Sequence, residues 1–162
     1  MIGPYLVVAE RIRQEVADLD RVVRRIERAA AAAQQHPEDR DLYLDAAALN
    51  LHDFYAGLER VFHHIATTID NSMPSGSEWH RDLLRQMRMS LPQVRPHVLS
   101  GETVKALDEF LCFRHVVRNI YAFEFDPERI DHLVQRLGPC FEAVQRELLT
   151  FADLLVQLAR DD

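Results

Sequence analysis

The chain has 162 residues, of which 48% are hydrophobic and 28% are charged, a composition typical of a soluble globular protein with one sizeable core. Its net charge of −7 argues against a surface that binds nucleic acid over a broad area, but it permits a small basic cleft. No apolar run reaches the roughly 20 residues of a membrane span and the N-terminus lacks a signal pattern, so we expect a cytoplasmic protein.

A long helix is predicted from Pro4 to about Gln35. Proline suits the first turn of a helix, and apolar residues then recur at steps of three and four. These residues are Val8, Ile12, Val16, Leu19, Val23, Ile26 and Ala30. Pro37 ends the helix, because proline disfavours helical geometry in the residue before it.

A second long helix is predicted from about Asp39 to Ile69. Its apolar stripe is expected to comprise Leu42, Ala46, Leu49, Leu58, Phe62, Ile65 and Ile69, with Asp53, Glu59, His63 and His64 as polar positions around the stripe. Adjacent residues of a helix point about 100° apart, so His63 and His64 make a poor chelating pair. We therefore expect no metal site here.

A shorter helix is predicted from Trp79 to about Met89. Arg81, Arg85 and Arg88 share one of its faces, with His80 adjacent. Such a face is either solvated or a basic wall that contacts RNA or an acidic partner.

The next helix is predicted to start at Gly101, with Ser100 or Thr103 near its N-cap. Asp126-Pro127 then starts a last helical region that reaches about Arg160, because aspartate is a good N-cap and proline is tolerated at the first helical position. Gly138-Pro139 is expected to kink or break that region.

Polar side chains gather on one face near the end of the helix that starts at Gly101. With Arg114 set at zero, Tyr121 lies at about −20°, Arg118 at about +40°, His115 at about +100° and Asn119 at about +140°. The packed side carries Phe113, Val116, Val117 and Ile120. Two arginines four residues apart repel each other, so they either point into water or hold an anion such as phosphate between them.

The whole pattern predicts an all-α fold in which residues 1–162 form a single domain. Four principal helices and one short extra helix would pack as an up-and-down bundle. The two cysteines, Cys112 and Cys140, form no CxxC pair, which predicts buried small side chains and neither a zinc site nor a disulfide.

Arg118-Asn119 followed by Tyr121, late in a helix of an all-helical chain, resembles the HEPN superfamily, and within it the HepT-like ribonuclease toxins. That family carries an arginine, four to six residues and a histidine, often followed by x-Tyr. Arg114, Asn119 and Tyr121 fit this frame, with Asn119 at the histidine position. The resemblance implies a HEPN-like bundle.

The chain departs from the family pattern in either register. A frame that starts at Arg118 would need a histidine at Phe123 or Glu124. The nearest imidazole is His115, one turn before Asn119.

The resemblance implies an RNA endonuclease that needs no metal and no cofactor. Arg114 and Arg118 would hold the scissile phosphate, because arginine pairs with phosphate bidentately and stays charged. His115 is the candidate for proton transfer, because imidazole titrates near neutral pH. Asn119 can only position a phosphate oxygen or the 2′-hydroxyl, since an amide does not transfer protons.

The resemblance also implies partners. In relatives, an MNT-type nucleotidyltransferase antitoxin adds AMP to the tyrosine after the motif, which corresponds to Tyr121, and HEPN proteins are typically homodimers that join two motif helices across one cleft. An alternative stays open: a catalytically inert HEPN dimer that acts as a nucleotide-binding or scaffold partner of a nucleotidyltransferase.

Overall fold

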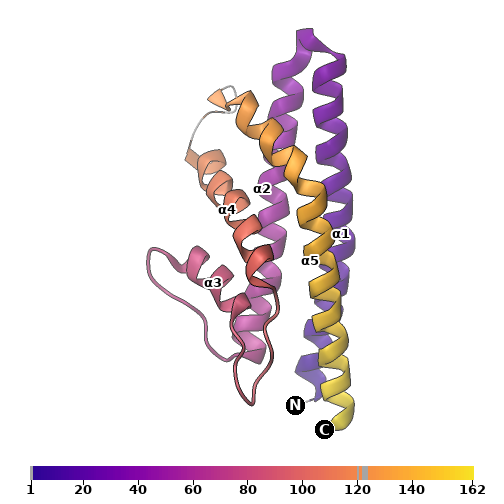
Figure 1. Ribbon diagram of the computed structural model, residues 1–162, viewed down its shortest axis with the longest axis vertical. Helices are drawn as coiled ribbons and strands as arrows, with labels where there is room; N and C mark the ends of the chain where they lie inside the picture. Colours follow the sequence, from indigo (N-terminus) through magenta and orange to yellow (C-terminus); the bar gives the residue numbers. More distant parts are fainter. Residues whose placement is uncertain (1, 120, 122–123) are drawn as a thin grey trace.

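The computed structural model describes residues 2–119, 121 and 124–162, and these residues form five α-helices and two short helical turns (Figure 1). The elements are α1 (Ile2–Gln35), the 3-10 turn η1 (Pro37–Asp39), α2 (Arg40–His64), the π-helical turn η2 (Ile65–Ile69), α3 (Trp79–Arg88), α4 (Gly101–Asn119) and α5 (Pro127–Asp161). The described residues contain no β-strand. The all-α prediction, with four principal helices and one short one, is confirmed.

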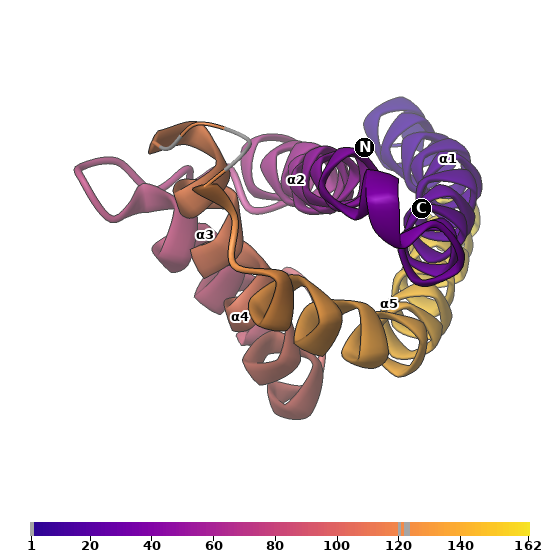
Figure 2. The same ribbon diagram turned by 90° about the horizontal axis from the view of Figure 1, so that it is seen from above.

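The helices pack as an elongated bundle. α1 and α2 form an antiparallel pair, α5 lies along α1, and α4 packs on α2 (Figures 1 and 2). The short α3 covers α2 and α4 at one side, and the two chain termini lie at the same end of the bundle. None of the described helices combines the length and the apolar character that a membrane span needs.

The predicted caps are confirmed. The Ser100 hydroxyl accepts a hydrogen bond from the Thr103 backbone N–H (3.2 Å) at the start of α4. The Asp126 carboxylate accepts one from the Glu128 N–H (3.0 Å), with Pro127 at the first position of α5. Both ends therefore follow from local side-chain chemistry.

The predicted stripe of α2 is wrong in its first half, because Leu42 and Leu49 are 63% and 58% exposed. Leu44 and Leu51 are buried in their place. The buried face contains small residues that let α1 approach closely: a Cβ added at Gly57 would meet the Leu19 side chain at 2.8 Å. The shape of the α2 surface therefore decides which of the two leucine stripes is buried. A count of apolar residues does not take this shape into account.

Of the kink or break predicted at Gly138-Pro139, the break does not occur, because α5 continues through Pro139 without interruption. In Figure 1 the helix changes direction along its length: its first part leans towards α4 and its last part follows α1. The buried Leu137 and Phe141 on either side of the proline pack into the core. Packing therefore holds the helix together across a residue that weakens it.

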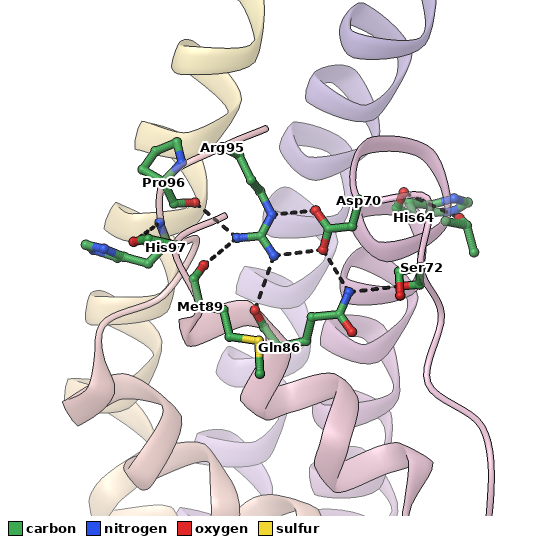
Figure 3. Close-up of polar contacts among 10 residues, drawn as sticks. His64, Asp70, Ser72, Gln86, Met89, Arg95, Pro96 and His97 are labelled. Carbon is green, nitrogen blue, oxygen red and sulfur yellow. Dashed lines mark hydrogen bonds and ion pairs between the residues drawn. The ribbon is translucent and has the colours of Figure 1, made fainter. Parts of the chain in front are cut away.

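A buried ion pair fixes the connector between α3 and α4. The Arg95 guanidinium and the Asp70 carboxylate are both fully buried and meet through two contacts of 2.6 and 2.7 Å (Figure 3). The remaining N–H groups of Arg95 donate to the carbonyls of Met89, Pro96 and Gln86. This network ties the end of η2 to the end of α3, and so it helps to position α3.

Candidate functional site

A cleft of about 370 Å³ lies where the first turn of α3 meets the last turn of α4. It is lined by Gly76, Ser77, Trp79, His80, His115, Arg118 and Asn119. Three of the five predicted site residues, His115, Arg118 and Asn119, therefore share one cavity. The cleft has a second wall, from α3, that the helical wheel of α4 does not show.

Glu59 of α2 holds His80 in that second wall. Its carboxylate is buried and lies 2.7 Å from Nδ1 of His80. Because an ionised carboxylate only accepts hydrogen bonds, Nδ1 carries the proton and donates it. One face of the imidazole stacks on the Trp79 ring, with 3.6 Å between the ring centroids. Two contacts thus fix the orientation of His80.

His115 faces His80 across the cleft, with the two ring centroids 5.4 Å apart. Partial burial lowers the pKa of the His115 imidazole, and the positive charges of His80, Arg114 and Arg118 lower it further, against an opposing contribution from Glu59. An imidazole whose pKa lies below its ordinary value is uncharged at neutral pH. His115 can therefore accept a proton there.

The two motif arginines line different cavities. The side chain of Arg114 is only 11% exposed and turns towards α2, where its Nη2 lies 3.5 Å from the Glu59 carboxylate. It lines a neighbouring cavity of about 280 Å³ together with His63 and His64. Arg118 is exposed and lines the main cleft. Trp79 borders both cavities.

Asn119 is tied to its own helix, because its Nδ2 donates a hydrogen bond to the His115 carbonyl (2.6 Å). Tyr121 lies beyond the last residue of α4 and is 71% exposed. Ile120, predicted on the packed face, and Phe123, a position of the second register, lie outside the described residues.

The arginine face predicted on α3 lies against the first two thirds of α4. Arg81 lies 3.4 Å from the Asp108 carboxylate and also contacts the Cys112 sulfur. Arg85 and Arg88 line a separate cavity between α3 and α4. These arginines are therefore not part of the cleft that holds His115.

Two residues of the site, Glu59 and His80, are not found by the family motif. Glu59 is predicted as a polar position around the apolar stripe, and the structure adds that its side chain is buried. Its spacing carries a signal: it follows Tyr55 by four residues and precedes Phe62 by three, and both of these are buried. A carboxylate at that spacing lies on the core face and needs a cationic partner.

A family model described as "HepT-like protein" matches residues 46–155, from early in α2 to the last turns of α5. Neither a curated protein nor a solved structure matches the chain. The matched region includes Glu59, His80 and the motif at the end of α4, and it covers well over half of the sequence. The chain therefore belongs to the HepT-like family of HEPN-type proteins.

Proposed function

We propose that the protein is a HepT-like toxin that cleaves RNA without a metal, in the cleft between α3 and α4. One observation carries the proposal: the exposed Arg118 and the imidazole of His115, whose pKa is lowered, line the same cavity. When a 2′-hydroxyl attacks the adjacent phosphate, the reaction requires two groups. One is a permanently charged cation that binds the phosphate, and the other is an uncharged base that accepts the hydroxyl proton.

Each motif residue has a role in this reaction. His115 takes the proton from the 2′-hydroxyl, which attacks the adjacent phosphorus, and Arg118 pairs with the phosphate oxygens. The Asn119 side chain is anchored through its Nδ2, so its Oδ1 can orient the 2′-hydroxyl. Arg114 adds positive charge from the ion pair with Glu59 behind the cleft.

We further propose that an MNT-type nucleotidyltransferase neutralises the toxin by adding AMP to Tyr121. The side chain is 71% exposed, which suits access by a modifying enzyme, and it follows Arg118 by three residues. A phosphodiester at this position would place bulk and negative charge near the cleft, where it competes with RNA phosphate. Incubation with ATP and the transferase should add one AMP to the wild type and none to Tyr121→Phe, as measured by intact mass.

We also propose that the protein acts as a homodimer whose motif helices face each other. The cleft of one chain presents one exposed guanidinium, Arg118, whereas a twofold pair would present two to one RNA strand. Light scattering at micromolar concentration should report a dimer. A strict monomer would remove the composite cleft.

Cleavage of RNA by purified variants tests the proposed activity. Arg118→Ala should abolish cleavage and growth inhibition, and alanine favours the helix, so folding should not suffer. His115→Ala should lose about 10²–10⁴ in rate. Two controls remove the same kinds of side chain at exposed positions elsewhere: Arg24→Ala on the α1 surface and His97→Ala in the connector between α3 and α4. Equal cleavage by wild type and Arg118→Ala would place the site elsewhere.

A second candidate, an inert HEPN dimer that serves as a scaffold or nucleotide-binding partner, is favoured by the amide of Asn119 at the histidine position and by its bond to its own helix. In that case the wild type cuts no RNA. Asn119→His, which restores the family spacing from Arg114, is then expected to create cleavage.

A further inference from the structure

A second imidazole enters the cleft from outside the motif helix. His80 belongs to α3, yet its ring lies 5.4 Å from that of His115, and both line the cavity that contains Arg118. Two imidazoles at this separation are close enough to act on one phosphodiester. They come from two separate helices, α3 and α4.

Glu59 prepares His80 for proton transfer. It accepts the Nδ1 proton at 2.7 Å, which leaves Nε2 as the ring nitrogen available for a substrate in the cleft. A buried carboxylate in this position also stabilises positive charge that forms on the ring, as the aspartate of a Ser-His-Asp triad does. Stacking on Trp79 holds the ring plane.

The proposed reaction leaves one task without a residue. His115 removes a proton from the 2′-hydroxyl, but the departing 5′-oxygen also needs a proton, and the amide of Asn119 cannot supply it. We propose that His80 is the general acid of the cleft and that Glu59 is its positioning residue. This inference rests on the proposed function and names the group that replaces the motif histidine.

The step balances with these two residues. The 2′-oxygen forms a bond to phosphorus as the P–O5′ bond breaks. Uncharged His115 accepts the 2′-hydroxyl proton, and His80, as the imidazolium, transfers a proton to the 5′-oxygen. The products are a 2′,3′-cyclic phosphate and a 5′-hydroxyl. The two rings finish with exchanged charge states, and solvent restores them.

Two substrates distinguish a residue that acts as the general acid from one that acts as the general base. RNA has a poor leaving group that needs a proton, whereas uridine 3′-(4-nitrophenyl phosphate) releases a nitrophenolate that does not. His80→Ala should lose about 10²–10⁴ in rate on RNA and far less on the aryl ester. His115→Ala should lose rate on both substrates. His97→Ala, which removes an exposed imidazole from the connector, is the matched control.

Glu59→Gln tests the positioning role. An amide of the same size no longer supplies negative charge to His80, so this variant should also lose more rate on RNA than on the ester. In the pH profile of kcat/KM, the decrease at high pH reports the general acid. This decrease should change in Glu59→Gln and disappear in His80→Ala. The titratable and charged groups around His80 are Glu59 from α2, to which Arg114 also pairs, and His115 and Arg118 from α4. None of these is altered in His80→Ala.

The outcomes separate the two proposals. A wild type that cleaves neither substrate would overturn the proposed function and the assignment of His80 with it. An active wild type with equal RNA cleavage by His80→Ala would overturn the assignment alone. So would equal losses on both substrates in a variant whose circular dichroism matches the wild type. If His80→Ala fails to fold, the same substrate comparison with Glu59→Gln decides.

Discussion

Asp70 with Arg95, and Glu59 with Arg114, are two buried pairs of a carboxylate and a guanidinium in the same small protein. The first pair meets through contacts of 2.6 and 2.7 Å, and backbone carbonyls accept from the rest of the Arg95 donors. In the second pair the closest contact is 3.5 Å, and Nε and Nη1 of Arg114 have no acceptor among the described residues.

The difference separates a structural site from one that is open to chemistry. A buried donor without an acceptor costs about 1–3 kcal/mol, so a pair that serves stability alone should resemble Asp70 and Arg95. Glu59 and Arg114 instead line the cavity of about 280 Å³ beside the main cleft, and the Glu59 carboxylate also bonds to His80. Incomplete pairing beside a cleft is typical of groups that act on a ligand.

The largest effect on stability is expected from breaking the satisfied pair. Asp70→Ala strands the Arg95 guanidinium, which is fully buried, and should cost about 3–5 kcal/mol of unfolding free energy. Chemical denaturation followed by circular dichroism measures the loss. Asp153→Ala, which breaks an exposed pair with Arg13, is the matched control and should cost about 0–1 kcal/mol. Equal losses in the two variants would contradict the structural role of Asp70.

Local signals account for what the sequence predicts well. Pro37, the Ser100 cap and Asp126-Pro127 each act within a few residues, so the ends of the helices follow from the chain itself. The clustering of His115 and Arg118 is likewise a property of one helix.

The features that the sequence does not predict depend on contacts between distant elements. Glu59 and His80 are 21 residues apart, and Asp70 and Arg95 are 25 apart, so no helical wheel brings either pair together. Leu42 is exposed because the approach of α1 decides which face of α2 is buried. A periodicity count predicts that α2 is amphipathic, but it cannot distinguish two leucine stripes of similar strength.

Replacing each arginine by methionine sharpens the comparison. Arg95→Met strands Asp70 and should cost about 3–5 kcal/mol. Arg114→Met removes donors that have no acceptor and leaves Glu59 bonded to His80, so it should cost less than about 1 kcal/mol. Unfolding curves of the two variants under the same conditions provide the test. A loss at Arg114 as large as that at Arg95 would mean that both pairs serve stability.

The smallest effect is electrostatic and concerns His115. Partial burial lowers the pKa of His115, and the positive charges of His80, Arg114 and Arg118 lower it further because they disfavour the imidazolium. Arg114→Met should therefore raise that pKa towards the ordinary value of about 6.5. Removal of Arg114 also leaves more of the Glu59 charge uncompensated, which favours the imidazolium and acts in the same direction.

Titration of the imidazole C–H resonances by NMR measures this shift without relying on catalysis. The His115 midpoint should lie below about 6.5 in the wild type and should rise in Arg114→Met. Arg24→Met, which removes a guanidinium from the α1 surface, should leave it unchanged, because solvent and salt screen exposed charges beyond about 10 Å. A midpoint that stays or falls in Arg114→Met would show that Arg114 does not set the charge state of the base. The cleft would then depend on burial, His80 and Arg118 to keep His115 uncharged.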